Sequence, residues 1–258
     1  MRKRDKSAKT PSALRNIKLT IEYDGSRYQG WTRLGKDESN NTISNKILEV
    51  IRKMTGESDI ELNCGCRTEV GVHAYAQVAN FKTGSDMKLL DMKHYLNRYL
   101  PMDIAIIRVD EVPDRFHAQL NATSKTYVYR MTIDDVPSVF DRKYTYHCFK
   151  TPDRQLMQQA GILLTGTHDF KNFSSSKKSK STVRQVYEVE IYSAAQEMQI
   201  MIHADDFLHN MARLMVGTLL DIGFYTRPKE DIDDILEGSM DASAPCDPKG
   251  LYLQEITY

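Results

Sequence analysis

The chain has 258 residues, enough to bury a sizeable core and to form one large domain or two of ordinary size. A hydrophobic share of 41% and a charged share of 27% are typical of a globular protein. No apolar run approaches the roughly 20 residues that a membrane span needs. The 35 basic and 35 acidic side chains balance. The overall charge therefore gives no support for a nucleic-acid partner, although a neutral protein can still present one basic face.

The cysteines and the N-terminus indicate the compartment. Cys64, Cys66, Cys148 and Cys246 form no C-x-x-C pair, and no two histidines lie at zinc spacing, so we expect neither a disulfide framework nor a metal site. Residues 1–14 are polar and basic and are predicted to form a disordered tail. No hydrophobic signal region follows this tail, which favours a reducing, cytoplasmic location.

The first half of the chain is expected to have the element order β-α-β-β-α-β. Its first strand ends at the turn signal Asp24-Gly25, and its first helix has Thr42 as N-cap and stops at Gly56. The expected elements are a strand over 16–23, a helix over 43–55, a short strand over 59–62, a strand over 74–82, a helix over 88–99 and a strand over 103–109. This order is the ferredoxin-like arrangement.

A ten-residue loop, 64–73, joins two of these strands and concentrates the residues that carry chemistry. Arg67 and Glu69 are two residues apart, so in an extended backbone their side chains would point to the same side and could form an ion pair. Gly65 and Gly71 permit tight turns or the close approach of a ligand. A purely structural loop with a buried ion pair is the alternative explanation for this composition.

The second half begins near Val112-Pro113 and is expected to contain a hairpin, a long apolar helix and a short acidic helix. The expected elements are a strand over 123–132, a helix over 152–164, strands over 183–192 and 198–203, helices over 206–224 and 228–236, and a last strand that begins at Gly250. Strands on one side and helices on the other in each half indicate two related α+β modules that share a sheet.

Several of these segments resemble motifs of one family. Residues 66–73, C-R-T-E-V-G-V-H, are similar to the G-R-T-D-A-G-V-H signature of the TruA family of tRNA pseudouridine synthases. The other similar motifs are E-Y-D-G-x-x-Y-x-G-W at 22–31, F-H-A-R-x-x-A-x-x-K-x-Y-x-Y at 116–129, G-x-H-D-F at 166–170 and F-L-x-H-M-V-R-x-x-V-G at 207–217. They occur in the family's order and span about residues 16 to 257. Among the departures are Cys66, Glu69, Val70, Gln119 and Asn210, where the family has glycine, aspartate, alanine, arginine and histidine.

The resemblance implies an α+β pseudouridine synthase fold. Two ferredoxin-like halves would share a mainly antiparallel sheet, with helices on one side and a central cleft. We expect the first half, with the loop, over residues 15–112 and the second half over residues 113–258.

The resemblance also implies a reaction and the residues that carry it. Uridine would be isomerised to pseudouridine in the anticodon stem-loop of tRNA, without metal or redox cofactor. Glu69 takes the place of the catalytic aspartate, and Tyr127 aligns with the tyrosine that stacks on the base and helps to move its proton. Arg67 and Arg213 align with the arginines that pair with the carboxylate and help to open the nucleotide from its stack.

The partners implied are tRNA and a second copy of the chain, with the RNA spanning both subunits of a homodimer. Candidate RNA contacts are Arg27, Tyr28, Lys177, Lys178 and Lys180, and recognition would rest on shape, backbone contacts and stacking.

Two other hypotheses stay open. Glutamate is one methylene longer than aspartate, so the protein could be a catalytically impaired paralogue that binds tRNA without isomerising it. A metal hydrolase that uses Glu69 and His73 is a third, less favoured class, because no metal-ligand spacing supports it.

Overall fold

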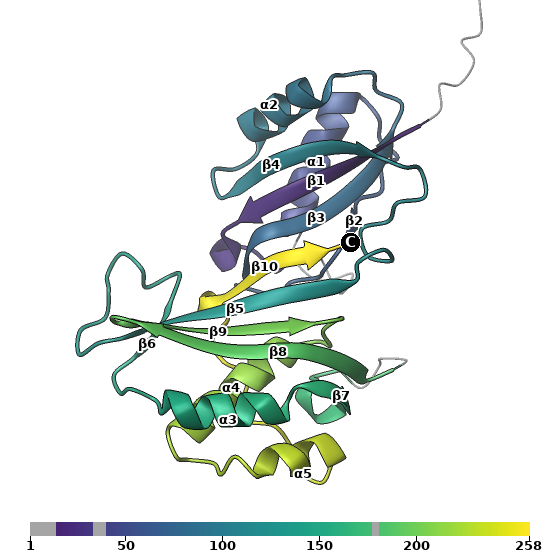
Figure 1. The fold of residues 1–258 in the computed structure, drawn as a ribbon. Coiled ribbons are helices and arrows are strands. Elements are labelled where there is room, and N and C mark those ends of the chain that lie inside the picture. The colour runs from purple at the N-terminus through teal and green to yellow at the C-terminus, as the bar shows by residue number, and fades with distance from the viewer. Residues whose placement is uncertain (1–13, 33–39, 177–180) are drawn as a thin grey trace, which may run out of the picture.

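The computed structural model describes residues 14–32, 40–176 and 181–258, and the elements below lie within those ranges (Figure 1). The predicted tail over 1–14 lies, except for its last residue, outside the described residues. The strands are β1 (Arg15–Tyr23), β2 (Asn63–Cys64), β3 (His73–Thr83), β4 (Ile104–Val112), β5 (Ser124–Ile133), β6 (Tyr146–Cys148), β7 (Gly166–Asp169), β8 (Val183–Ala194), β9 (Glu197–Ala204) and β10 (Leu251–Thr257). The helices are α1 (Ile43–Thr55), α2 (Leu89–Tyr99), α3 (Arg154–Leu163), α4 (Met211–Gly223) and α5 (Asp231–Glu237).

All of these strands belong to one sheet, with the order β4-β1-β3-β10-β5-β9-β8-β7. The short strands β2 and β6 pair with β3 and β5. Only the pairs β10–β3 and β5–β6 are parallel among the described strands, so the sheet is mainly antiparallel as predicted. The last strand, β10, lies between β3 and β5 and so joins the two halves of the chain in the centre of the sheet (Figure 1).

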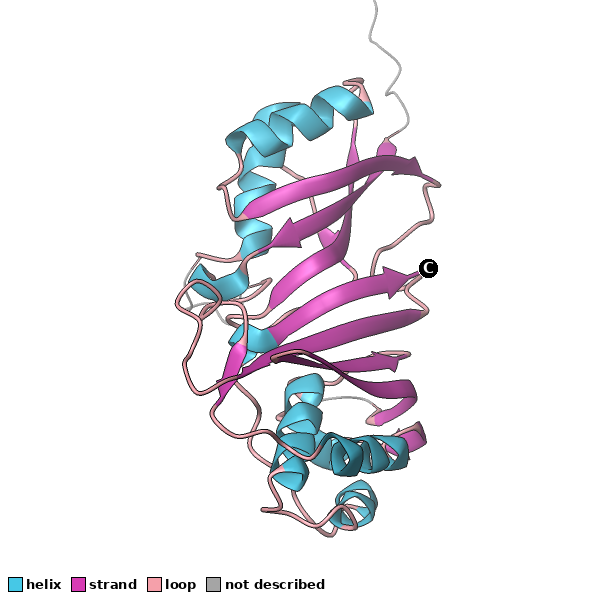
Figure 2. Ribbon diagram, turned by 60° about the vertical axis from the view of Figure 1, so that its left-hand side comes forward, coloured by secondary structure: helices cyan, strands magenta, loops and turns pink. Residues whose placement is uncertain are grey.

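The helices form two groups on the sheet. Helix α2 packs on β4 and beside α1, at one end, and α3 packs on β8 and beside α4, at the other. Figure 2 shows the strands stacked along the molecule with these two helix groups at its upper and lower ends. No helix among the described residues is both long and apolar enough to cross a membrane. The division into halves at residues 112 and 113 falls where β4 ends, and it stays a prediction because β10 pairs across it.

Helix α1 shows how directly the pattern of the sequence determines an element. The Thr42 side chain accepts a hydrogen bond from the Asn45 N–H, and Gly56 ends the helix in the left-handed conformation, with φ at 74°. The buried residues of α1 recur at helical spacing: Ile43, Ile47, Val50, Ile51 and Met54. The predicted bounds and core face are confirmed.

Four details of the prediction are corrected by the structure. No strand forms over 59–62, and only Asn63–Cys64 pairs with β3 in that described segment. The long helix begins at Met211 rather than residue 206, because the backbone of Asn210 is left-handed, with φ at 62°, and interrupts the helical path. The acidic helix begins at Asp231 rather than residue 228. Strands β6 and β7 were not expected, because each is only three or four residues long.

Candidate functional site

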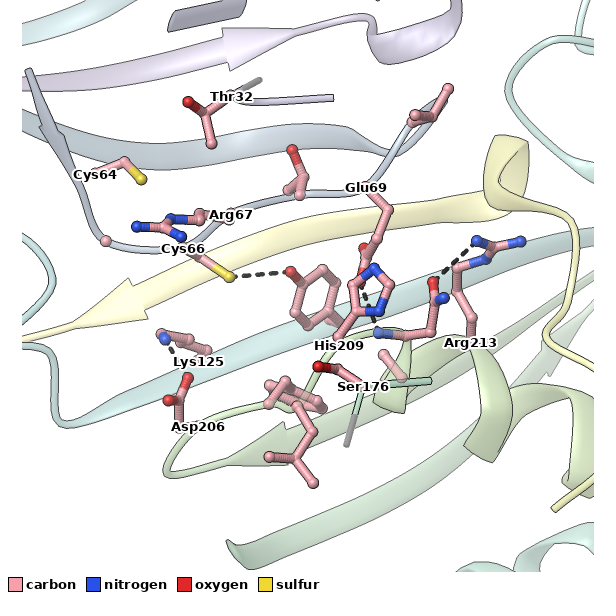
Figure 3. Close-up of a pocket in the computed structure, with 18 of the residues that line it drawn as sticks. Thr32, Cys64, Cys66, Arg67, Glu69, Lys125, Ser176, Asp206, His209 and Arg213 are labelled. Atoms are coloured by element: carbon pink, nitrogen blue, oxygen red, sulfur yellow. Dashed lines mark hydrogen bonds and ion pairs between the residues drawn. The ribbon is translucent and has the colours of Figure 1, made fainter. Parts of the chain in front are cut away.

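A cleft of about 750 Å³ opens over the centre of the sheet, where the loop after β2 faces the start of α4 (Figure 3). Its lining comes from segments that are far apart in the sequence, and all four predicted catalytic residues belong to it. The lining residues are Gln29, Thr32, Cys64, Gly65, Cys66, Arg67, Thr68, Glu69, Val70, Gln119, Lys125, Tyr127, Ser176, Asp206, Phe207, Leu208, His209, Asn210, Ala212 and Arg213.

The backbone of the loop is held by a buried glutamine on β3. Gln77 is fully buried, and its Nε2 donates to the Cys66 carbonyl at 2.6 Å while its Oε1 accepts from the Cys66 N–H at 3.3 Å. The Gly65 N–H donates to the Val78 carbonyl at 2.8 Å, which continues this attachment to β3. Sequence reasoning missed Gln77. Its signal was a polar residue in a strand segment whose other positions are mostly apolar or small.

The segment after β1 supports the next residue of the loop. The Thr68 hydroxyl lies 2.7 Å from the Tyr23 hydroxyl, and the Thr68 carbonyl accepts from the Trp31 N–H at 3.0 Å. Gly30 has φ at 77°, and a side chain there would place its Cβ 2.8 Å from the Thr68 oxygen. The tyrosine, glycine and tryptophan of residues 22–31 therefore act mainly as the support of the loop.

Glu69 points into the cleft, toward the start of α4 (Figure 3). Its Oε1 accepts a hydrogen bond from the Asn210 N–H at 2.9 Å. Asn210 is the residue immediately before α4, and the positive end of a helix dipole favours a carboxylate there. The half-buried carboxylate is thus held by a backbone donor.

The two arginines lie on either side of Glu69 in the cleft but do not pair with it. Arg213 donates from Nε to the Cys246 carbonyl at 2.8 Å and from Nη1 to the Asn210 Oδ1 at 3.0 Å. Arg67 is exposed and extends away from Glu69 (Figure 3). Within the described residues no ion pair joins Glu69 to either guanidinium at 4.0 Å or less.

The expected ion pair between Arg67 and Glu69 is therefore absent in this structure. The expectation assumed an extended backbone, but residues 65–69 are not part of a strand, so the rule that residues two apart share a side does not apply. Glu69 has turned toward α4 instead, and the guanidinium of Arg67 has no hydrogen bond or ion pair with the rest of the described chain.

Tyr127, on β5, forms the floor of the cleft. It is 3% exposed, and its ring packs edge-on against Phe207 with the ring centroids 4.9 Å apart. Its hydroxyl lies 3.1 Å from the Cys66 Sγ (Figure 3). Burial raises the pKa of Tyr127 well above its usual range, so the phenol is neutral at physiological pH.

An ion pair between a buried lysine and a half-exposed aspartate closes the end of the cleft nearest Cys66. The Lys125 ammonium, on β5, pairs with the Asp206 carboxylate, and the lysine is only 6% exposed. Burial raises the pKa of the neighbouring Cys64 thiol to about 12, so this sulfur stays protonated. Lys125 belonged to a motif in the sequence but had no predicted role, because its partner lies 81 residues away.

Two of the motif histidines, His73 and His168, are structural. His73 is 1% exposed, and its Nδ1 accepts from the Gly25 N–H at 3.1 Å while its ring stacks on Tyr252 at a centroid distance of 4.8 Å. The Nε2 of His168 lies 2.9 Å from the Thr165 carbonyl. The described part of the chain contains no group of three or more His, Cys, Asp or Glu side chains placed to hold a metal ion.

The predicted RNA contacts differ in their exposure and in their bonding partners. Arg27 is exposed and forms an ion pair with Asp103. Tyr28 does not line the cleft, and its hydroxyl donates to the same Asp103 carboxylate, so its ring is not placed to stack on a base in the cleft. Lys177, Lys178 and Lys180 lie outside the described residues.

The sequence of the chain matches one family of known proteins. The family model described as tRNA pseudouridine synthase matches residues 19–121 and 160–258, so the chain belongs to that family. The resemblance found in the motifs is confirmed.

Curated relatives show which members of the family have sequences similar to this chain. A protein of Bacillus anthracis named tRNA pseudouridine synthase A 2 is 44% identical over 95% of this chain and 100% of its own length. Proteins of the same name from a strain of Bacillus cereus and from Clostridium tetani are 45% and 40% identical over 95% of this chain and 100% and 99% of theirs. Among solved structures, a chain of the archaeal box H/ACA sRNP Nop10-Cbf5 complex covers 79% of this chain and 44% of its own length. Its sequence identity of 12% and TM-score of 0.33 are too low to support a structural comparison.

Proposed function

We propose that the protein is a tRNA pseudouridine synthase that isomerises uridine to pseudouridine in the anticodon stem-loop, with Glu69 as its catalytic carboxylate. The observation that carries the proposal is the convergence of Glu69, Tyr127, Arg67 and Arg213 on one cleft, in a chain of this family. These residues come from a loop, a strand and a helix, and all of them line the same cleft.

The chemistry needs few groups. The N-glycosidic bond breaks, the base turns, and it rejoins the sugar through carbon. Glu69 either attacks the anomeric carbon or removes a proton from the sugar, and both roles need an ionised carboxylate directed into the cleft. The backbone donor at Asn210 holds the Glu69 carboxylate in the cleft at the start of α4.

The other residues of the cleft suit the base and the phosphates. The neutral Tyr127 can stack on a uracil ring and exchange a hydrogen bond with it. The unpaired guanidinium of Arg67 is available to a phosphate oxygen of the RNA. A stacked uridine must be flipped out to be reached, and a cleft of about 750 Å³ has room for one everted nucleotide.

We further propose that two copies of the chain act together and that the protein works in the cytoplasm. Strands β5 and β6 are connected by a segment that presents several large apolar side chains to solvent. Within it and just beyond β6, Val136, Val139, Phe140 and Phe149 are 66% to 89% exposed. Large exposed apolar side chains in one segment are typical of an association surface, which supports the expected homodimer.

The test of the proposed activity uses purified protein and unmodified tRNA. Pseudouridine should accumulate with the wild-type protein and be absent with Glu69→Gln, because the amide cannot act as nucleophile or base. Glu61→Gln is the matched control: this glutamate is exposed, precedes the same loop and does not line the cleft. Loss of product in both variants, or in neither, would refute the role assigned to Glu69.

A binding protein without isomerase activity is the second candidate, and one observation favours it: Glu69 is not paired with either arginine. The same assay distinguishes it. Binding of tRNA without product, unchanged in Glu69→Asp, would identify a protein that handles tRNA but does not modify it.

A further inference from the structure

Lys125 and Asp206 line the cleft at the end away from Glu69, and the proposed reaction has so far given them no role. Figure 3 shows this ion pair at one end of the lining and Glu69 and Arg213 at the other. The Lys125 side chain is 7% exposed, whereas the Asp206 side chain is 47% exposed. The pair therefore combines a buried ammonium with a carboxylate that is open to the cleft.

Tyr127 lies between the two ends of the cleft. It is two residues from Lys125 on β5, so both side chains point to the same face of the sheet. Phe207, which packs edge-on against the Tyr127 ring, directly follows Asp206 in the chain. The Glu69 carboxylate is one of the groups whose charge acts on the Tyr127 phenol. A base that stacks on this ring, with its ribose at the catalytic carboxylate, therefore presents its far edge to the ion pair.

The ion pair can offer both a donor and an acceptor to that edge. An ammonium has three hydrogens, and among the described residues Asp206 is the only hydrogen-bond partner of the Lys125 ammonium. The second carboxylate oxygen, Asp206 Oδ2, lies 4.0 Å from the Arg184 guanidinium, which is too far for a hydrogen bond. Each member of the pair thus keeps hydrogen-bonding capacity for a ligand.

Stability alone does not account for a lysine at this position. Removing an ammonium from water is costly, and a well-packed apolar side chain usually serves the stability of the fold as well as a buried ion pair does. Ligand sites, in contrast, combine apolar and aromatic walls with a few placed polar groups. Tyr127 and Phe207 supply such walls beside the ion pair.

The far edge of uracil has the complementary groups. Its O4 accepts a hydrogen bond and its N3–H donates one, whereas cytosine has a donor and an acceptor at the same two positions. An ammonium beside a carboxylate therefore matches uracil and opposes cytosine, because cytosine would bring donor to donor and acceptor to acceptor.

The same two contacts suit the base after it has turned. A half-turn about the axis through N3 and C6 exchanges N1 with C5 and O2 with O4, and it leaves N3–H in place. The edge that faces the ion pair thus keeps one carbonyl oxygen and one N–H. One pair of protein groups can hold the uracil while its point of attachment to the sugar changes from nitrogen to carbon.

We propose that Lys125 and Asp206 are specificity-determining residues that bind the Watson–Crick edge of the everted uracil before and after it turns. The Lys125 ammonium donates to the carbonyl oxygen, which is O4 in uridine and O2 in pseudouridine, and the Asp206 carboxylate accepts from N3–H. Enzymes that act on flipped bases commonly read this edge. This inference rests on the proposed function.

The test combines a change in the protein with a change in the base. Rate constants of single turnover are compared for unmodified tRNA and for the same tRNA with 4-thiouridine at the modified position, because sulfur is a weaker acceptor than oxygen. Lys125→Met has a side chain of similar length without a donor. We expect it to lower the rate on uridine about tenfold or more, and to make the rate penalty for sulfur about tenfold smaller than in the wild-type protein.

Lys82→Met is the matched control for this substitution. Lys82 also forms an ion pair, with Asp114, but it does not line the cleft. The control variant should keep the wild-type rate on uridine and the full penalty for sulfur. Any effect of sulfur on the chemical step itself is the same in all of these proteins, so it cancels in the comparison.

Asp206→Asn tests the second contact and preserves the shape of the side chain. Lys125 needs the amide oxygen as its acceptor, which leaves the amide NH2 toward N3 of the base. The probe is 3-methyluridine, in which a methyl group replaces the hydrogen on N3. The ratio of the rates on uridine and 3-methyluridine should be about tenfold smaller in Asp206→Asn than in the wild type, because the variant has already lost the N3–H contact.

Thermal melts establish that each variant is folded, and Asp206→Asn carries the test if Lys125→Met does not fold. A folded variant that loses rate equally on both bases of its pair would overturn this inference, because that result indicates a structural role alone. Wild-type rates in both variants would also overturn it, and either result leaves the proposed function intact. Wild-type protein that forms no pseudouridine from uridine would refute the proposed function itself.

Discussion

Replacing Glu69 by aspartate, the residue of the family signature, is predicted to lower activity in this protein. The hydrogen bond from the Asn210 N–H reaches Glu69 Oε1 at 2.9 Å. Aspartate is shorter by one C–C bond of roughly 1.5 Å. The carboxylate would therefore withdraw to roughly 4 Å from that N–H, beyond hydrogen-bonding distance. Its closest defined contact would be lost, and the carboxylate would no longer be held in one position.

The size of the effect follows from that contact. A hydrogen bond to a charged group contributes about 1.5–3 kcal/mol, which corresponds to about a 10- to 100-fold change in rate. A displacement of the catalytic group by about 1 Å has a similar effect. We therefore expect kcat of Glu69→Asp to fall about 10- to 100-fold, and Glu69→Gln to form no product.

Single-turnover measurement of pseudouridine in unmodified tRNA is the appropriate assay, because it reports the chemical step without product release. Glu61→Asp makes the same change at an exposed position just before the loop and should leave the rate unaltered. A Glu69→Asp variant that is as fast as the wild type, or faster, would refute the reasoning. It would mean that the contact with Asn210 does not define the reactive position of the carboxylate.

Three further predictions concern the support of the cleft. Cys66→Gly removes the partner of the Tyr127 hydroxyl and should lower kcat about 2- to 10-fold. Cys66→Ser keeps a hydrogen bond to that hydroxyl and should retain activity. Equal rates in the glycine and serine variants would contradict this prediction. Gln77→Ala leaves the N–H and carbonyl of Cys66 unpaired and should reduce the free energy of unfolding by about 2 kcal/mol or more, measured by urea denaturation. Burial lowers the pKa of His73 in the folded protein. Below about pH 6.5 the unfolded chain therefore binds a proton at this histidine before the folded protein does, and the free energy of unfolding falls as the pH falls toward the lowered pKa. His73→Asn, which keeps an acceptor for the Gly25 N–H, should show a shallower fall over that range; identical slopes would exclude this contribution.

The sequence predicted what depends on local pattern. The apolar spacing of α1, its cap at Thr42 and its end at Gly56 are determined within a few residues of each other, so their prediction was accurate. The motifs also brought Glu69 and Tyr127 together correctly in one cleft, because the family signature carries information that no single segment holds.

What the sequence did not reveal depends on contacts between distant segments. The left-handed backbone of Asn210 shortens α4, and no local pattern distinguishes this asparagine from one inside a helix. Tyr28 was predicted to be a surface contact for RNA. Its hydroxyl is instead held by Asp103, 75 residues away, and its ring is buried. Gln77 was read as part of a strand because its two bonds to Cys66 form only when the loop folds back on β3.

The three departures from the signature have separate structural explanations. The Cys66 thiol extends from the loop to the Tyr127 hydroxyl, at 3.1 Å, and so fills space that glycine would leave open. Val70 is 51% exposed, so its extra bulk lies in solvent and requires no shift of the backbone. The additional length of Glu69 carries its carboxylate to the Asn210 N–H across the cleft, where an aspartate on the same backbone would fall short. The glutamate and the left-handed start of α4 form one unit, and changing either should affect the other.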